Sequence, residues 1–232
     1  MRSLILFLAA TVAAPGQSSF TQQLWKEAAP VYRETLAHPF LRGLADGSLP
    51  KERFKFYMRQ DARYLTQFGK ALSALAAKAP DEKTSIFLNE GALATIRTER
   101  LLHQTFFTEA EFAATEMSPT NVAYTNHLLA TVTRGTYAEG LAAVLPCYWI
   151  YAEVGKELKK RGSKDEGYAR WINQYGSEAF DAKVKEILAM MDAAAARATE
   201  EERREIRKIF LRSVRYEYLF WDMAWREEAW RP

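Results

Sequence analysis

The feature of this sequence that most constrains its fold is a helical period that runs almost without a break from Phe20 to the C-terminal end. Apolar residues recur every three or four positions, and no stretch of useful length alternates apolar and polar residues as a strand does. Capping hydroxyls, glycines and prolines divide the period into segments. We therefore predict an all-α protein that folds as a single-domain helical bundle of about ten helices.

The predicted helices begin at capping residues and end at glycine or proline. Ser48 and Ser118 are expected to supply capping hydroxyls, because each stands just ahead of a proline suited to a first helical turn. The predicted segments cover residues 19–37, 40–45, 48–78, 80–107, 108–114, 118–134, 136–161, 165–175, 177–198 and 199–230.

Composition narrows the class of protein. The 232 residues are 48% hydrophobic, which is enough to bury a large core, and no repeat or linker interrupts residues 17–232. The net charge is only +3 and the two signs are interspersed, so no basic stripe suggests nucleic-acid binding. The single cysteine excludes an internal disulfide.

Residues 1–16 form a separate unit. One basic residue precedes an apolar run that ends in small residues, which is the layout of a secretory signal peptide with cleavage after Gly16. The alternative is a disordered leader on a cytoplasmic protein. The run is too short to remain in a bilayer as a spanning helix, so we predict no membrane segment in the mature chain.

Two carboxylates and the cysteine stand on apolar helix faces. Asp61 interrupts the stripe of residues 54–72, Glu217 interrupts that of residues 206–224, and Cys147 shares a face with apolar residues just after Pro146. A buried carboxylate costs several kcal/mol unless it is paired or hydrogen-bonded. Each acid taken alone can be explained as a paired core residue, and the cysteine alone as a small buried hydrophobic residue. The three residues together favour a functional site.

The chemistry of such a site follows from the residue types. None of the three histidines is placed by sequence to activate the thiol, so a hydrolase of the papain kind is poorly supported. A carboxyl kept protonated by its apolar setting, together with an ionised one, can supply the acid and base steps while the cysteine forms a covalent bond. Nearby tyrosines and tryptophans favour a small planar heterocycle as ligand.

A metal site is the competing interpretation. Glu99 and His103 lie one helical turn apart, with Glu90 further back, and this spacing can hold a metal in a helical bundle. A surface ion pair has the same spacing, and there is no second Glu-x-x-His unit, so we predict no metal. His38 could in principle bind haem, but Pro39 follows it, which favours a helix cap.

The chain resembles the TenA group of thiaminase II proteins, also called aminopyrimidine aminohydrolases, from about Phe20 to Trp225. Each matching motif alone is weakly specific, but the combination of motifs in this order and spacing is specific. The pieces are His38-Pro39-Phe40, Gln60-Asp61 with Tyr64-Leu65, Tyr124, Pro146-Cys147-x-Trp149-x-Tyr151, Tyr175 with Ser177-Glu178-x-Phe180, and Tyr216-Glu217-x-x-Phe220-Trp221.

This resemblance implies a fold similar to haem oxygenase, a homotetramer, no cofactor, and hydrolysis at the methylene carbon of 4-amino-2-methylpyrimidines. It implies that Cys147 is the nucleophile, that Glu217 is the acid on a ring nitrogen, and that Asp61 holds the exocyclic amine. The remaining implied contacts are Tyr64 and Tyr175 around the ring, Tyr124 and Tyr151 orienting the thiol and Glu217, and Phe220 at the ring edge.

Two departures from the family pattern stand out. Ala62 and Arg63 follow the aspartate where relatives often place aromatic residues, and the family is typically cytoplasmic and lacks an export leader. Fold does not settle function, so two rivals remain open. One is another enzyme on this scaffold, a cofactor-free oxidase or a metal-dependent oxygenase. The other is a regulatory protein, in which Asp61, Cys147 and Glu217 do not converge.

Overall fold

The computed structural model describes residues 18–103 and 107–231, which form ten α-helices and no strand. The all-α prediction is therefore confirmed for this part of the chain. The helices are α1 (Phe20–Ala37), α2 (Pro39–Asp46), α3 (Lys51–Ala76), α4 (Glu82–His103), α5 (Glu109–Ala114), α6 (Pro119–Arg134), α7 (Tyr137–Lys159), α8 (Glu166–Tyr175), α9 (Glu178–Arg197) and α10 (Glu200–Arg226).

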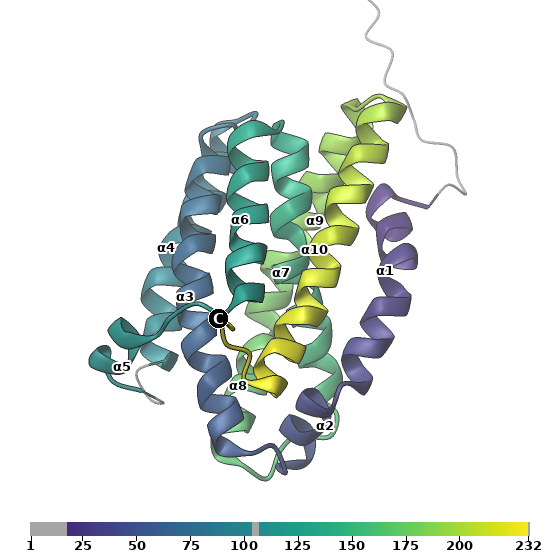
Figure 1. Ribbon diagram of the computed structural model, residues 1–232. Helices are drawn as coiled ribbons and strands as arrows, with labels where there is room; N and C mark the ends of the chain where they lie inside the picture. Colours follow the sequence, from purple (N-terminus) through teal and green to yellow (C-terminus); the bar gives the residue numbers. More distant parts are fainter. Residues whose placement is uncertain (1–17, 104–106, 232) are drawn as a thin grey trace, which may run out of the picture.

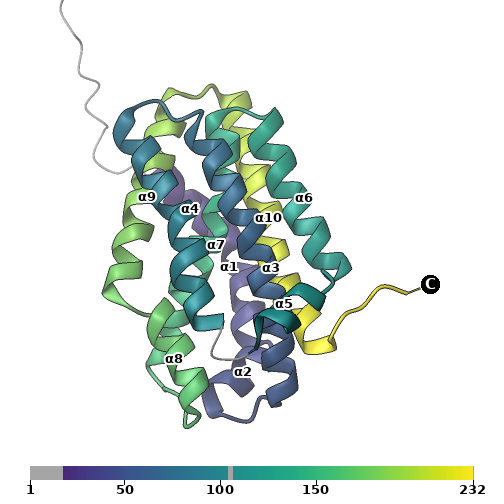
Figure 2. The ribbon, with the colours of Figure 1, turned by 90° about the vertical axis from the view of Figure 1, so that its left-hand side faces the viewer.

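The long helices stand side by side, and the short helices α2 and α8 lie at one end of the bundle (Figures 1 and 2). Helix α7 is the central element, because α10, α6, α9, α8 and α3 all pack against it. Helix α4 packs mainly on α3, and α1 covers α10. A helix surrounded in this way exposes little of its middle part to solvent, so the sequence of that part must be apolar on all sides.

The sequence of α7 meets this requirement. Every residue from Gly140 to Pro146 is buried, and so is the segment from Tyr148 to Ala152. The helix continues through Pro146 as one element, with Cys147 in the following position. Cys147 is only half-buried, unlike its neighbours on either side. The thiol therefore lies at an opening in an otherwise closed part of the core.

The predicted apolar stripes of α3 and α10 are confirmed, including their acidic members. The buried side chains of α3 include Phe54, Tyr57, Met58, Asp61, Tyr64, Leu65, Phe68 and Leu72. Those of α10 include Ile206, Phe210, Val214, Glu217, Phe220, Trp221 and Ala224. Asp61 is 3% exposed and Glu217 is 2% exposed. Two carboxyl groups from different helices are thus inside the protein.

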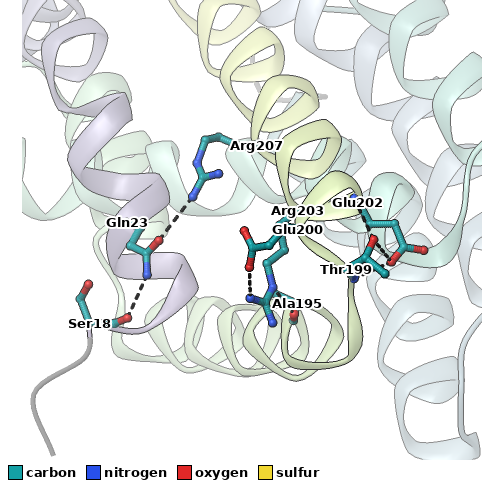
Figure 3. Close-up of polar contacts among 8 residues, drawn as sticks. All are labelled: Ser18, Gln23, Ala195, Thr199, Glu200, Glu202, Arg203 and Arg207. Atoms are coloured by element: carbon teal, nitrogen blue, oxygen red, sulfur yellow. Dashed lines mark hydrogen bonds and ion pairs between the residues drawn. The ribbon is translucent and has the colours of Figure 1, made fainter. Parts of the chain in front are cut away.

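Hydrogen bonds fix the turn between α9 and α10, and a further one links α10 to α1 (Figure 3). The Thr199 hydroxyl accepts from the Glu202 backbone N–H at 3.2 Å, while Glu202 Oε2 accepts from the Thr199 backbone N–H at 2.6 Å, which completes a capping box. Arg203 Nε donates to the Ala195 carbonyl at 2.8 Å across the turn. Arg207 donates to Gln23 of α1 at 3.3 Å.

Two predicted helix starts are wrong in detail. Helix α3 begins after Pro50 and has no side-chain cap, because the backbone N–H of Leu49 is bonded to the Gly43 carbonyl at 3.0 Å and holds Ser48 outside the helix. Ser118 is the N-cap residue of α6, but its hydroxyl donates to the Glu228 carbonyl at 2.7 Å and does not cap the helix.

The last helix ends earlier than predicted, at Arg226. Glu227 adopts a left-handed conformation with φ of 47°, and the next backbone N–H returns to the Met223 carbonyl at 3.0 Å, which stops the helix. The tail then folds back on the start of α6, where Trp230 Nε1 donates to the Met117 carbonyl at 3.0 Å. A contact 113 residues away in sequence decides this boundary.

Three expectations fall outside the described residues. The leader 1–16 is one, and the extension of the fourth helix through residues 104–106 is another. The backbone of Glu99 and His103 belongs to α4, but their side chains are outside the described part, so the prediction that this pair holds no metal is not tested. Within residues 18–103 and 107–231, none of the helices combines the length and hydropathy needed to cross a bilayer.

Candidate active site

A cavity of about 510 Å³ opens between helices and is lined mainly by apolar side chains. This volume is within the range typical of pockets for small organic ligands. Helices α3, α7 and α8 form its inner wall, and α4 and α9 form its outer wall. The lining residues are Asp61, Leu65, Phe68, Lys83, Ile86, Phe87, Glu90, Gly91, Ala94, Thr95, Cys147, Tyr148, Tyr151, Gln174, Tyr175, Ser177, Ala179, Phe180, Lys183 and Glu186.

Four of the eight candidate residues line the inner wall. Asp61 comes from α3, Cys147 and Tyr151 lie one turn apart on α7, and Tyr175 is the last residue of α8. The rings of Tyr151 and Tyr175 have centroids 4.9 Å apart. A planar ligand in the cavity would therefore meet a thiol, a carboxylate and two phenol rings.

The other four candidates lie behind this wall, in a buried layer that does not line the cavity. The hydroxyl of Tyr124, on α6, donates to Glu217 Oε1 at 2.5 Å. The Tyr64 ring lies 5.0 Å from the Tyr124 ring and 5.4 Å from the Phe220 ring, measured between centroids. Asp61 and Glu217 influence each other electrostatically, as do Tyr64 and Cys147. All eight residues thus belong to one region.

The carboxyl of Glu217 is held in its neutral form. Its pKa is raised from 4.5 to about 8, mainly by burial; the Tyr124 hydrogen bond acts in the opposite direction, and the nearby charge of Asp61 adds to the rise. At neutral pH Glu217 therefore carries a proton. Burial also raises the pKa of Tyr64, Tyr124 and Tyr151 well above 10, so these phenols remain hydrogen-bond donors.

Close backbone packing fixes where Tyr175 sits. Gly155 of α7 lies directly against the end of α8, and a Cβ added there would be 2.5 Å from the Gly176 nitrogen and 2.5 Å from the Tyr175 carbonyl carbon. No side chain fits at that distance. Tyr57, on α3, adds a second constraint, because its hydroxyl donates to the Tyr151 hydroxyl at 3.2 Å.

A buried polar network holds α3 against α6 beside the site. The side chain of Gln60, the neighbour of Asp61, accepts from the Ser118 backbone N–H at 3.0 Å and from Asn121 Nδ2 at 2.8 Å. Its own amide donates to the Glu116 carbonyl at 2.8 Å. Gln60 and Asn121 are both buried. Because Asn121 is one turn before Tyr124, this network fixes the two helices that carry Asp61 and Tyr124.

Sequence reasoning missed the outer wall of the cavity. It assigned no site role to the α4 residues Phe87 and Gly91 or to the charged residues Lys83, Lys183 and Glu186, and it considered Glu90 only for the metal site that it then discounted. A signal was present, because the lining residues of α4 recur at helical spacing from 83 to 95. They mix lysine, glutamate, glycine and apolar residues, so the pattern is not that of a buried face.

The metal and haem interpretations gain no support from the described side chains. Within the described part of the chain, His, Cys, Asp and Glu nowhere form a group of three suited to a metal ion. His38 caps a helix, as predicted, with its Nδ1 accepting from the Phe40 backbone N–H at 3.2 Å. Its Nε2 lies 3.6 Å from a carboxylate oxygen of Asp222.

Comparison with known proteins assigns the chain to a family. The model of the TENA/THI-4/PQQC family matches residues 25–227, which include all eight candidate residues. This chain belongs to that family. A relative in Bacillus subtilis (strain 168) named aminopyrimidine aminohydrolase is 40% identical over 216 residues, covering 91% of this chain and 92% of the relative. A protein of the same name in Halalkalibacterium halodurans is 34% identical, covering 91% of this chain and 98% of the relative.

Solved structures of other proteins have the same fold. A TenA homologue protein from P. horikoshii OT3 superposes with a TM-score of 0.83 at 30% identity and covers 90% of this chain and 99% of its own. A protein from Shewanella denitrificans described as having a heme oxygenase-like fold superposes with a TM-score of 0.69 over 89% of this chain and 92% of its own. At 16% identity, the latter speaks for the fold alone. The predicted haem-oxygenase-like architecture is confirmed.

Proposed function

We propose that this chain hydrolyses the bond between the methylene carbon of a 4-amino-2-methylpyrimidine and its leaving group, by covalent catalysis through Cys147, to give the hydroxymethylpyrimidine. The family relationship carries the reaction type. Relatives named aminopyrimidine aminohydrolase are 30–40% identical and cover about nine tenths of the chain, so the chain is a hydrolase of that type. This activity belongs to the salvage of thiamine fragments.

One observation supports the covalent mechanism most. Cys147 and Asp61 line the same cavity, and directly behind it Glu217 has a pKa of about 8. A thiol, an ionisable acid and a protonated acid are the three groups that the reaction needs. In the proposal, Asp61 accepts hydrogen bonds from the exocyclic amine, which selects aminopyrimidines. The regulatory alternative expected these three residues to lie apart.

The proposed steps balance as follows. The sulfur of Cys147 forms a bond to the ring carbon beside a ring nitrogen, and that nitrogen takes a proton from Glu217. The ring, now no longer aromatic, pushes the leaving group off the methylene carbon together with the electron pair of that bond. An amine leaves with the proton that the Cys147 thiol gave up when its sulfur attacked, whereas the thiazole of thiamine is already cationic and needs no proton. Water adds its oxygen to the methylene carbon, and the proton that it loses passes to the sulfur of Cys147 when an amine has left and to solvent when thiazole has left. The carbon–sulfur bond then breaks, the thiolate leaves, and the proton returns to Glu217.

The other residues are proposed to shape the ligand's surroundings. The family resemblance implies Tyr64 and Tyr175 on the two sides of the ring and Phe220 at its edge. Of these only Tyr175 lines the cavity, so contact with Tyr64, Phe220 and Glu217 requires the ring to reach past the inner wall into the layer behind it. Tyr124 and Tyr151 would orient Glu217 and the thiol. These roles need no cofactor. The homotetramer implied by the family resemblance also stays a prediction, which light scattering on the purified chain would test.

Product analysis tests the proposal. Wild-type protein and Cys147→Ser are each incubated with aminomethyl-aminopyrimidine and, separately, with thiamine, and hydroxymethylpyrimidine is quantified by chromatography. We expect wild-type turnover of at least one substrate and a loss of several orders of magnitude in the variant, because an alcohol is a far poorer nucleophile than a thiolate. Thr95→Ser, another change on the cavity wall, is the matched control and should retain activity.

Two results would reject the proposal. Unchanged turnover by Cys147→Ser would exclude covalent catalysis by this thiol. Absence of hydroxymethylpyrimidine from both substrates with folded wild-type protein would reject the reaction itself. Because Cys147 is the only cysteine, a mass adduct in the wild type that is missing from the variant would also locate a trapped intermediate directly.

A further inference from the structure

Four aromatic rings form a column, and the second of them, Tyr124, is hydrogen-bonded to the buried acid Glu217. From the cavity side outward they are Tyr64 of α3, Tyr124 of α6, Tyr216 of α10 and His127 of α6. Successive centroids are 5.0, 5.0 and 5.5 Å apart, and the Tyr124 and Tyr216 planes are inclined by only 10°. The column therefore interleaves α6 and α10, with Tyr124 held between two tyrosine rings.

A second link between α6 and α10 lies at the outer end of the column. His127 Nε2 shares a hydrogen bond of 3.0 Å with the hydroxyl of Ser213, which is fully buried. His127 follows Tyr124 by three residues, and Ser213 precedes Glu217 by four. The His127–Ser213 link and the Tyr124–Glu217 hydrogen bond are thus about one helical turn apart on the same pair of helices.

We propose that Tyr216 and His127 are positioning residues that hold the hydroxyl of Tyr124 on the carboxyl of Glu217. Neither residue lines the cavity, and in the column both lie beyond Tyr64 and Tyr124 as seen from it. Tyr216 supplies the flat surface against which the Tyr124 ring stacks, and His127 fixes that surface from the other side while Ser213 fixes His127. The inference rests on the proposed function, because it assumes that Glu217 is the acid.

The reason for such support is geometric. A tyrosine ring can turn about two side-chain bonds, and a small rotation would break a hydrogen bond as short as 2.5 Å. The Tyr216 ring, which stacks on Tyr124, and the tilted Tyr64 ring next to it restrict that rotation. Offset-stacked aromatic pairs stabilise each other beyond their buried area, so the column opposes rotation of its inner members.

The surroundings of Glu217 leave Tyr124 as its direct hydrogen-bond donor. The titratable groups that act on it are Tyr124 from α6, Asp61 and Tyr64 from α3, and Tyr151 from α7. Only the Tyr124 bond favours the charged form, whereas burial and Asp61 favour the neutral form. Losing the correct position of Tyr124 therefore moves the pKa of Glu217 upward. His127 stays neutral, because burial and Arg212 lower its pKa to about 4.

The test measures the pKa of Glu217 in substrate-free protein. Glutamate is labelled with carbon-13 at the carboxyl carbon, the Glu217 signal is assigned by its loss in Glu217→Gln, and its shift is followed against pH. Tyr124→Phe removes the hydrogen bond to Glu217, so we expect it to give the largest rise in the pKa of Glu217. We expect Tyr216→Leu to raise the pKa by about half a unit or more, between wild type and Tyr124→Phe.

Matched variants distinguish the effect of an aromatic ring at these positions from the effect of its hydrogen bond. Tyr216→Phe keeps the stacking surface and should leave both pKa and turnover near wild type. His127→Gln keeps a partner for Ser213 without the ring, and His127→Phe keeps the ring without the hydrogen bond. Each should give a smaller shift than Tyr216→Leu. In steady-state assays we expect kcat to fall roughly tenfold in Tyr216→Leu with KM changed by less than about twofold, because ligand contacts are intact.

The outcomes separate this inference from the proposed function. A wild-type Glu217 pKa in folded Tyr216→Leu, or in both His127 variants if Tyr216→Leu does not fold, overturns the inference. A higher Glu217 pKa in both Tyr124→Phe and Tyr216→Leu supports the inference. If Cys147→Ser also keeps full activity, the inference still stands and only the proposed covalent mechanism fails. Loss of thermal stability without a pKa shift would assign Tyr216 a purely structural role and reject the inference.

Discussion

The two walls of the cavity are built on different principles. The inner wall, from α3, α7 and α8, consists of residues such as Asp61, Tyr151 and Tyr175 that are almost completely buried and are backed by the layer around Glu217. The outer wall, from α4 and α9, presents exposed charged side chains, among them Glu90 and Lys183. The same ligand would contact both walls.

We expect the inner side of the cavity to carry out the reaction and the outer side to affect how the ligand enters and binds. Exclusion of water raises the pKa of a carboxyl group, as it does at Glu217. The buried layer behind the inner wall therefore holds a protonated acid at neutral pH, whereas the charges of the outer wall act on a ligand through water, which weakens their effect. We expect substitutions on the inner side to change kcat and substitutions on the outer side to change KM.

The largest expected effect is on the buried acid. Glu217→Gln keeps the shape and a hydrogen-bonding amide but cannot transfer a proton, so kcat should fall about 10²–10⁴-fold, the range typical of general acid–base catalysis. Glu90→Gln, the same change on the outer wall, is the control. Steady-state kinetics with aminomethyl-aminopyrimidine measures both. Equal, small losses in the two variants would remove the distinction between the walls.

An intermediate effect concerns stability against pH. The folded pKa of Glu217, about 8, is above its ordinary value of 4.5, so between these values the folded protein holds a proton that the unfolded chain releases. The unfolding free energy should therefore decrease as pH rises through this window, by on the order of a few kcal/mol, and Glu217→Gln should lack this contribution. Chemical denaturation at several pH values measures the difference. Parallel curves for wild type and variant would mean that Glu217 is not buried as a neutral acid.

The smallest expected effect is on the outer wall of the cavity. Replacing Glu90 or Lys183 by Gln should change KM by less than about fivefold and leave kcat unaltered, because exposed charges contribute about 1 kcal/mol at most. The change should shrink as salt is added, since screening weakens exposed charges. A large loss of kcat in either variant would place α4 or α9 in the chemistry and contradict the comparison.

Much of the fold could be predicted from local sequence. The stripes of α3 and α10 follow from helical period, and the acids within them stood out because the remaining positions are apolar. The end of α10 could not be predicted, because the tail is held by contacts with Met117 and Ser118 from a distant segment. The outer wall was missed for a similar reason, since small and charged residues on α4 reveal a cavity only when α9 stands opposite.

The sequence alone determined that the protein is helical and that Asp61, Cys147 and Glu217 lie on buried faces, because period and residue type depend on each helix separately. The family resemblance implied that the three would act together, which stays a prediction. Only the tertiary structure decided that Cys147 and Asp61 share a cavity while Glu217 stands behind it with Tyr124, Tyr216 and His127 in a column. The physical reason is that burial, stacking and the pKa of an acid depend on what neighbouring helices bring to it, and a single helix does not carry that information.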